Sequence, residues 1–467
     1  MKELRRNMRF IGIILTILFV GAGIWYGVTV YEQGSVWASN VYNPRLAKTD
    51  SDRGDITDRN GVTLATTDDE GNRVYLSNES ARRALSQTVG DTAGMSGAGV
   101  ESFFSSTLLE LSSSFSDRLS ELFSNSAHVG ASIQITVDAE LQSYIASQFP
   151  DGYSGAVCVL NYRTGEIIAM VSMPNYDPYG VDNSDEGVAD TAYLNRCLQG
   201  LYTPGSIFKI VTLASALDYD SNVVNQTFTC SGTWEYQGGS IVCMSGRTAH
   251  GEMTLKKAFT KSCNVTFGKL AYQLGADRLR STAELFGFNE NFKFGDFVVY
   301  NSSFPKNMSS MNSLVWAGIG QGEVLVTPLH VAMISAAVAN GGQMMQPYLV
   351  KEITTSSAQV RCRGESKVYR RVMSESSAQT IAEYMYETVQ SGTASRAAVP
   401  GYTVCGKTGS AETSDDKTKE TNAWYTGFIY DDNCPYAISV VIEEGGAGGQ
   451  MAAQLAAKAL SYAAKHS

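Results

Sequence analysis

Residues 10–30 form a predominantly apolar run without a charged side chain. An α-helix of about this length crosses the hydrocarbon core of a bilayer, so the sequence predicts one membrane-spanning helix here. Four basic residues precede the run, and only Arg45 and Lys48 follow it before residue 50, which predicts a cytoplasmic amino-terminus with everything after residue 30 outside. A cleaved signal peptide, cut near Ala38, is the alternative. Signal peptides usually have an apolar core of about 7 to 15 residues, which favours a retained anchor.

Strand-like and helix-like patterns follow one another in the rest of the chain. Residues 155–174 contain two Val- and Ile-rich stretches joined by a Thr-Gly turn, which predicts a β-hairpin. Residues 206–285 have a mainly helical pattern, and residues 422–430 and 436–444 return to strand character. Residues 451–466 form an alanine-rich helix. This order predicts an α+β fold with helices packed on one antiparallel sheet.

The composition is that of an ordinary globular protein, with 43% hydrophobic and 18% charged residues. At 467 residues the chain is long enough for more than one domain. The whole chain carries a formal net charge of −10 and residues 1–30 carry +3, which leaves −13 for the remainder. An acidic exported part argues against a nucleic-acid partner.

The eight cysteines include no C-x-x-C pair, and the four histidines do not cluster in the sequence. This spacing is not typical of a metal site, so the sequence predicts no metal ion, and no other cofactor is expected. Cys230 and Cys243 flank the stretch CSGTWEYQGGSIVC. Outside a membrane such a pair can close a disulfide loop, and two free thiols are an equally good interpretation.

Candidate chemistry begins at Ser206 and Lys209, in the stretch YTPGSIFKIV. Pro204 and Gly205 favour a turn from which a helix begins, and residues three apart share one face of a helix. The amine of Lys209 is therefore expected within reach of the Ser206 hydroxyl. A lysine whose pKa is lowered by burial or by nearby positive charge can take the proton of a serine and make it a nucleophile.

The S-x-x-K pattern alone is weak evidence, because it occurs three times in this chain. At Ser303 a proline interrupts the turn, and at Ser414 the pattern lies in a charged, loop-like passage. Two further motifs strengthen the first copy. TKSCNVTF supplies Ser262 and Asn264, alternate residues that can face one cavity. VCGKTGSAE supplies a K-T-G motif at the end of a strand, where glycine permits close approach of a substrate backbone.

S-x-x-K at 206, S-x-N at 262 and K-T-G at 407 stand in the order and approximate spacing of the serine penicillin-recognising enzymes. The stretches RGDITDRNGVTLA, ITVDAELQ, HGEMTLKKAFTKSCNVTF and GIGQGEVLVTPLHVA resemble one branch, the class B penicillin-binding proteins. Members of that branch are membrane-anchored transpeptidases of peptidoglycan synthesis. The resemblance covers nearly the whole chain and is weakest at residues 66–130.

The resemblance implies a division of the chain into four parts. These are a cytoplasmic amino-terminus at 1–9, a transmembrane anchor at 10–30, a small extended pedestal of the dimerisation type at 31–149, and a penicillin-binding transpeptidase domain at 150–467. It also implies roles for the first two motifs. Ser206 would be the acylated nucleophile and Lys209 its base, while Ser262 would relay a proton to the leaving amine and Asn264 would hold the substrate's amide.

The third motif would recognise the end of the substrate. By the same resemblance, Lys407 would add positive charge to the cavity and Thr408 would bind the terminal carboxylate of the donor peptide or of a β-lactam. Gly409 would permit close approach, and the backbone N–H groups of Ser206 and Ser410 would form the oxyanion hole. Serine at 410 stands where threonine is commoner in the family. Since the donor there is a backbone N–H, little loss is expected.

The implied reaction is a two-step acyl transfer that cross-links peptidoglycan stem peptides of the lipid-linked precursor polymer. β-Lactams are the expected covalent inhibitors, and a SEDS-type glycosyltransferase is expected as a membrane partner by analogy with the branch. The expected location is the cell membrane, with a single pass. Three alternatives share the motifs or the fold: a β-lactamase, a D,D-carboxypeptidase, and a non-catalytic scaffold or penicillin sensor.

Overall fold

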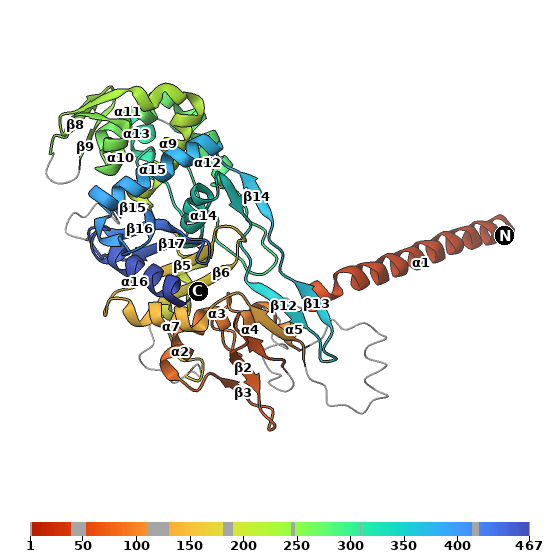
Figure 1. Ribbon diagram of the computed structural model, residues 1–467. Helices are drawn as coiled ribbons and strands as arrows, with labels where there is room; N and C mark the ends of the chain where they lie inside the picture. The colour runs from red at the N-terminus through yellow and green to blue at the C-terminus, as the bar shows by residue number, and fades with distance from the viewer. Residues whose placement is uncertain are drawn as a thin grey trace.

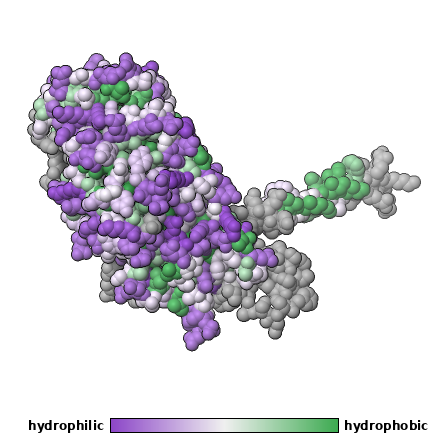
Figure 2. Space-filling model, in the orientation of Figure 1, coloured by the Kyte–Doolittle hydropathy of each residue, from purple (hydrophilic) through white to green (hydrophobic). Residues whose placement is uncertain are grey.

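The computed structural model describes residues 2–38, 53–109, 130–180, 190–243, 248–308, 310–412 and 420–466. Its first helix, α1 (Lys2–Ala38), stands apart from the body that holds the other elements (Figure 1). The segment Phe10–Thr29 of α1 has a mean hydropathy of 2.1, and none of it is buried. Figure 2 shows this segment as a hydrophobic rod. The helix is long and apolar enough to cross a membrane, as the sequence predicted for residues 10–30.

Five antiparallel strands form the central sheet, in the order β15-β16-β17-β5-β6. They are β5 (Gly155–Asn161), β6 (Ile167–Met173), β15 (Thr403–Ala411), β16 (Asn422–Tyr430) and β17 (Tyr436–Ile442). Along β5, Val157 and Val159 join the hydrophobic cluster on one face, while Cys158 and Leu160 join the cluster on the other. Strands β5, β6 and β17 are therefore apolar at most positions, because both faces of the sheet are covered.

Helices cover this sheet on both faces. α14 (Pro328–Ala339) packs on one face, and α7 (Ala139–Gln148) and α16 (Met451–His466) pack on the other. The hairpin predicted for residues 155–174 is confirmed as β5 and β6. The late strands and the closing alanine-rich helix are also confirmed. The predicted α+β fold with one flanked antiparallel sheet is thus correct for this part of the chain.

The helical layer above the sheet begins with α9 (Lys209–Tyr219) and continues with α10 (Leu255–Thr260), α11 (Asn264–Leu274) and α12 (Ala276–Phe286). The prediction of a mainly helical stretch over residues 206–285 is wrong for residues 227–254. Four short strands lie there: β7 (Thr227–Cys230), β8 (Thr233–Tyr236), β9 (Gly239–Val242) and β10 (Gly251–Thr254). β7 pairs with β10, and β8 and β9 form a hairpin; Thr, Trp, Tyr and Val between glycines favour such extended strands.

A second sheet has six strands in the order β13-β12-β4-β1-β2-β3. They are β1 (Ile56–Thr57), β2 (Thr63–Thr67), β3 (Arg73–Tyr75), β4 (Ser132–Ile135), β12 (Val350–Thr354) and β13 (Val360–Arg363). Two of these strands come from residues 350–363, far beyond the division that the sequence suggested at residue 150. A single cut at that position therefore does not separate the two sheets, and the exact domain boundary stays a prediction.

A buried ion cluster lies within residues 53–109, which precede the central sheet. Glu101 accepts hydrogen bonds from Arg53 at 2.9 Å and from Arg73 at 2.6 Å, and all three side chains are at most 2% exposed. Removing one partner from such a buried ion cluster typically costs about 3 to 5 kcal/mol. Arg53 is therefore a buried residue with a structural role, since it holds Glu101 in this cluster.

Most of the remaining helices and strands in the described part of the chain are short. The longest of them is α15, which packs against β15. These elements are α2 (Glu79–Ala84), α3 (Ser86–Val89), α4 (Val100–Phe103), α5 (Ser105–Leu108), α8 (Arg196–Gln199), α13 (Met311–Ala317), α15 (Glu375–Ser391), β11 (Gln343–Met345), β14 (Val368–Arg371), and the 3₁₀ turns η2 (Asp190–Tyr193), η3 (Gly205–Phe208), η4 (Ser221–Asn225) and η5 (Ser395–Ala397).

Candidate active site

Ser206 lies in the 3₁₀ turn η3, which runs directly into helix α9 at Lys209. Gly205, the residue before it, has φ 55°, a backbone conformation that strongly favours glycine. A Cβ at Gly205 would lie 2.5 Å from the carbonyl oxygen of Ser410, and a Cβ at Gly409 would lie 2.9 Å from that of Pro204. Glycine at both positions therefore allows the turn that carries Ser206 to pack directly against strand β15.

The second motif lies in the short loop between α10 and α11. The amine Nζ of Lys209 donates to Ser262 O at 2.8 Å, to Ser262 Oγ at 3.2 Å and to Asn264 Oδ1 at 2.7 Å. Asn264 is held in turn by Val242 O, which accepts from its Nδ2 at 2.9 Å. Ser262 has φ 55°, a strained conformation for a non-glycine residue and one that is typical of functional sites.

Lys407 on β15 reaches the same serine from the other side. Its Nζ donates to Ser262 Oγ at 2.9 Å and to Thr408 O at 2.9 Å. The hydroxyl of Ser262 therefore contacts the amines of both Lys209 and Lys407. The sequence predicted three separate motifs, and the structure brings all three together around Ser262 and beside Ser206.

Both lysines are completely buried, and burial is the main cause of their altered acidity. It lowers the pKa of Lys209 from the ordinary 10.5 to about 7. The pKa of Lys407 also lies well below its usual value, first through burial and then through the charge of Lys209. At pH 7 an ordinary lysine is neutral in only about one molecule in 3000, whereas a pKa near 7 makes the neutral amine a major species.

One detail of the expected geometry differs in the structure. Among the described residues, the hydrogen bonds of the Lys209 amine go to Ser262 and Asn264, and none joins it to Ser206. A neutral amine uses two hydrogens for the two shortest of these contacts and keeps its lone pair available. Catalytic hydrogen bonds are often longer in unliganded enzymes and shorten when substrate binds, so Lys209 remains suited to act as the base for Ser206.

Two cavities meet at Ser206. One of about 310 Å³ is lined by Ser262, Thr408, Gly409 and Ser410 in addition to Ser206. The other, of about 170 Å³, is lined by residues that include Ser206, Ser410 and Asn264. All predicted site residues except the two buried lysines line these spaces. A larger cavity of about 860 Å³ lies elsewhere and is lined by none of the motif residues.

Sequence reasoning missed two features of this site. Thr393, after α15, contacts Thr408 through their hydroxyl oxygens at 2.6 Å and lines the larger of the two cavities. Its only signal in the sequence is the short S-G-T stretch before β15. The second feature is a group of three cysteines and His250 beside Ser262, with side chains that are suitable metal ligands.

Comparison with known proteins agrees with this geometry. Residues 155–461 match the model of the penicillin-binding protein transpeptidase domain, which is more than half of the chain. The chain belongs to the penicillin-binding protein transpeptidase family. Among relatives of this penicillin-binding protein is "Peptidoglycan D,D-transpeptidase PbpA" of Mycolicibacterium smegmatis, 30% identical over 73% of this chain and 74% of that protein. "Peptidoglycan D,D-transpeptidase MrdA" of Haemophilus influenzae is 29% identical over 73% of this chain and 57% of that protein.

A solved structure of penicillin-binding protein A from M. tuberculosis, an acyl-enzyme complex, superposes on this chain with a TM-score of 0.81. It is 28% identical and covers 90% of this chain and 99% of its own. These matches confirm the predictions of a class B penicillin-binding protein and of a serine-type D-Ala-D-Ala transpeptidase. Together with the apolar helix α1, they also support a membrane-anchored protein.

Proposed function

We propose that this penicillin-binding protein cross-links peptidoglycan stem peptides through an acyl-enzyme on Ser206. The observation that carries the proposal is the convergence of two buried amines, Lys209 and Lys407, on Ser262 beside Ser206. Buried amines of lowered pKa can move protons near neutral pH without a histidine. The roles of the individual residues follow from this arrangement.

In the first step, Lys209 takes the proton of Ser206 while the serine oxygen attacks the penultimate D-alanine carbonyl. The carbonyl oxygen becomes an oxyanion, held by the backbone N–H groups of Ser206 and Ser410. Each such donor is typically worth about 3 to 4 kcal/mol. The intermediate then breaks its C–N bond, and the proton held by Lys209 passes through Ser262 to the leaving D-alanine.

In the second step, an amine of a neighbouring stem peptide attacks the ester on Ser206. The proton of this amine passes through Ser262 to Lys209. The ester C–O bond then breaks, and Lys209 returns the proton to the oxygen of Ser206 as the cross-link forms. Asn264 is suited to hold the substrate amide, because its side chain is fixed by Lys209 and by Val242 O.

The terminal carboxylate of the donor peptide is assigned to Thr408 beside the amine of Lys407. Thr393 shares a hydroxyl contact with Thr408 at 2.6 Å and can hold it in place. Gly409 leaves room for the peptide backbone against β15. A β-lactam would occupy the same position and acylate Ser206; the mycobacterial relative has been solved as an acyl-enzyme complex with one such drug.

The purified full chain, supplied with lipid-linked peptidoglycan polymer in vesicles, is expected to form cross-linked stem-peptide dimers and to release one D-alanine for each cross-link. Mass spectrometry of the digested product measures both. A D,D-carboxypeptidase would release D-alanine with shortened monomers and no dimers, and that result would overturn the transpeptidase assignment. Ser303→Ala, in the second S-x-x-K copy, serves as a control that should behave like the unaltered chain.

Helix α1 is proposed to place the amino-terminus in the cytoplasm and the catalytic body outside, where peptidoglycan is assembled. The support is the excess of basic residues before the apolar segment. This single-pass topology would put α1 and the second sheet beside membrane-embedded enzymes, and we assign a SEDS-type glycosyltransferase as the partner by analogy with the branch.

Replacing residues 10–30 by an unrelated membrane-spanning helix is expected to reduce co-purification of that glycosyltransferase from membranes. The reason is that contacts between membrane helices depend on the packing of specific side chains. Penicillin labelling of the catalytic domain should be unchanged and serves as the control for folding. Equal co-purification with either anchor would exclude a role for the helix in this partnership.

A further inference from the structure

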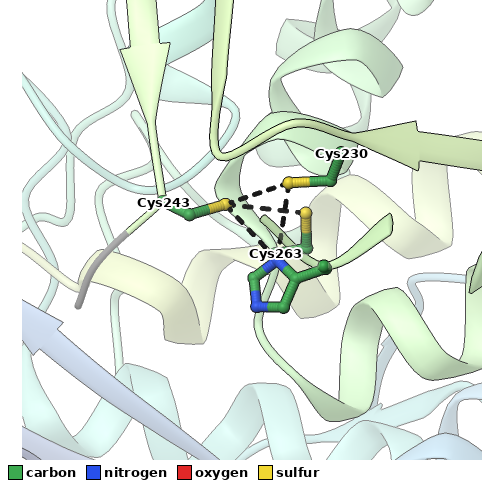
Figure 3. Close-up of side chains that lie close together, drawn as sticks. Cys230, Cys243 and Cys263 are labelled. Carbon is green, nitrogen blue, oxygen red and sulfur yellow. Dashed lines mark hydrogen bonds between the residues drawn. The ribbon is translucent and has the colours of Figure 1, made fainter. Parts of the chain in front are cut away.

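Three cysteines and one histidine meet next to the S-x-N loop. Cys230 ends strand β7, Cys243 directly follows β9, His250 directly precedes β10, and Cys263 lies between α10 and α11. Figure 3 shows the sulfur atoms of the three cysteines gathered around one point. The three sulfur atoms and the ligand nitrogen of His250 all lie within 4.8 Å of one another. The pairing of β7 with β10 puts Cys230 opposite Gly251, and hence beside His250.

We propose that Cys230, Cys243, His250 and Cys263 bind one Zn²⁺ ion in a tetrahedral Cys₃His site. The sulfur atom of Cys243 lies 3.6 Å from that of Cys230 and 3.7 Å from that of Cys263. The Nδ1 atom of His250 lies 3.5 Å from the sulfur of Cys230 and 3.6 Å from that of Cys243. Ideal tetrahedral zinc, with its usual bond lengths, separates two sulfurs by about 3.8 Å and a sulfur from a nitrogen by about 3.6 Å.

The surroundings of the sulfur atoms suit thiolate ligands. The backbone N–H of Gly232 points to the sulfur of Cys230 at 3.4 Å. The sulfur of Cys263 caps the amino-terminus of α11 and accepts from Thr266 N at 3.4 Å and from Thr266 Oγ1 at 3.3 Å. Such N–H and O–H donors and a helix amino-terminus stabilise negative sulfur, and metal ligands commonly have partners of this kind.

The four ligands also make a closed site. The three cysteines are buried and His250 is half-buried at the edge of the cavity that contains Ser206. Four protein ligands occupy all four coordination positions of a tetrahedral zinc ion and leave none for substrate or water. The site is therefore structural rather than catalytic. A disulfide between Cys230 and Cys243 would bring their sulfurs to about 2.05 Å and would leave Cys263 and His250 without a function. No disulfide joins Cys230 and Cys243 in the structure.

The location indicates what the ion would hold together. Cys263 is the middle residue of the S-x-N motif, between Ser262 and Asn264, and the other three ligands come from the ends of the strand pair β7–β10 and of the hairpin β8–β9. Bound zinc would therefore fasten the loop that carries Ser262, strained at φ 55°, to both pairs of strands. The expectation of no metal rested on the absence of C-x-x-C spacing. The four ligands instead lie within residues 230–263 with 12, 6 and 12 residues between successive ligands, and strand pairing brings them together.

The test is elemental analysis of the full chain, purified in detergent without chelators, by inductively coupled plasma mass spectrometry. About one zinc per chain is expected, falling to below about 0.2 in Cys230→Ser and in His250→Ala, because a Cys₃His site needs all four ligands. Cys362→Ser, an exposed cysteine, and Cys405→Ser, a buried one outside the cluster, should keep about one zinc.

A second measurement covers the case in which the ligand variants do not fold. The unaltered chain, stripped of metal with a chelator, is titrated with Co²⁺ alone; thiolate-to-cobalt absorption and tetrahedral d–d bands are expected, and Zn²⁺ should abolish them. Three results would overturn the proposal. The first is a purified chain that contains no metal and shows no such bands with Co²⁺. The others are iron in place of zinc and a Cys230–Cys243 disulfide found by peptide mapping. Zinc retained in full by both ligand variants would overturn it as well. Metal content does not depend on the roles proposed for Ser206 and Lys209, so it tests the site separately.

Discussion

Replacing Ser206 by alanine is expected to abolish covalent penicillin binding and to reduce cross-linking by at least about 10⁴-fold, as loss of a nucleophile does in other serine enzymes. In the proposed mechanism the hydroxyl of Ser206 supplies the atom that forms the ester, and alanine has no replacement for it. The turn η3 is kept by Gly205 and by the backbone, so the body should fold normally. Fluorescent penicillin labelling of the full chain, followed on gels and by intact mass, measures the effect.

Ser303→Ala is the matched control, because Ser303 and Lys306 repeat the S-x-x-K spacing elsewhere in the chain. The bonds that Ser303 makes to Leu325 use backbone atoms and survive the substitution. This variant should label like the unaltered chain. Labelling that persists in Ser206→Ala and disappears in Ser303→Ala would reverse the assignment of the two motifs.

Lys209→Met is expected to slow acylation by about 10² to 10⁴-fold, the usual contribution of a general base. Methionine fills a similar volume, but it leaves Ser262 O and Asn264 Oδ1 without the donor that they have now. In the unaltered chain the acylation rate should rise with pH and level off above about 7, because Lys209, with a pKa of about 7, must lose its proton to act. The variant should lose this rise as well as the rate. Stopped-flow acylation over a range of pH measures both.

Lys306→Met, at an exposed lysine of the second S-x-x-K copy, is the control and should keep both the rate and the pH profile. The combination of a slower rate and a lost pH-dependent rise distinguishes a base from a residue that only supports the loop. If Lys209→Met slowed acylation but kept the same rise near pH 7, another group would be the base, and Lys407 would be the first to test.

Sequence reasoning succeeded where local geometry decides the outcome. A Pro-Gly turn followed by an apolar run predicts a helical turn at Ser206, and the 3₁₀ turn η3 lies there, but the amine of Lys209 bonds to Ser262 and Asn264 instead of Ser206. The hairpin at 155–174 and the closing helix are equally local patterns. Ser262 and Lys407 were joined to this site by resemblance alone, because no periodicity in the sequence indicates contacts between segments so far apart along the chain.

The features that the sequence did not predict depend on long-range pairing. Strands β12 and β13 join a sheet whose other strands all lie before residue 136, so a linear division at residue 150 could not anticipate them. Cys230 and His250 meet only because β7 pairs with β10, which the helical interpretation of that stretch had excluded. The contact between Thr393 and Thr408 likewise depends on the packing of α15 against β15, which no local pattern in the sequence indicates.

The most direct test of the central claim is to locate the β-lactam adduct on the unaltered full chain by intact mass and peptide mapping. A single adduct on the peptide that contains Ser206, stable over hours, is the predicted result, because a transpeptidase hydrolyses its β-lactam ester slowly. An adduct on any other residue, or hydrolysis of the drug without a lasting adduct, would contradict the account of Ser206 as the nucleophile of a transpeptidase.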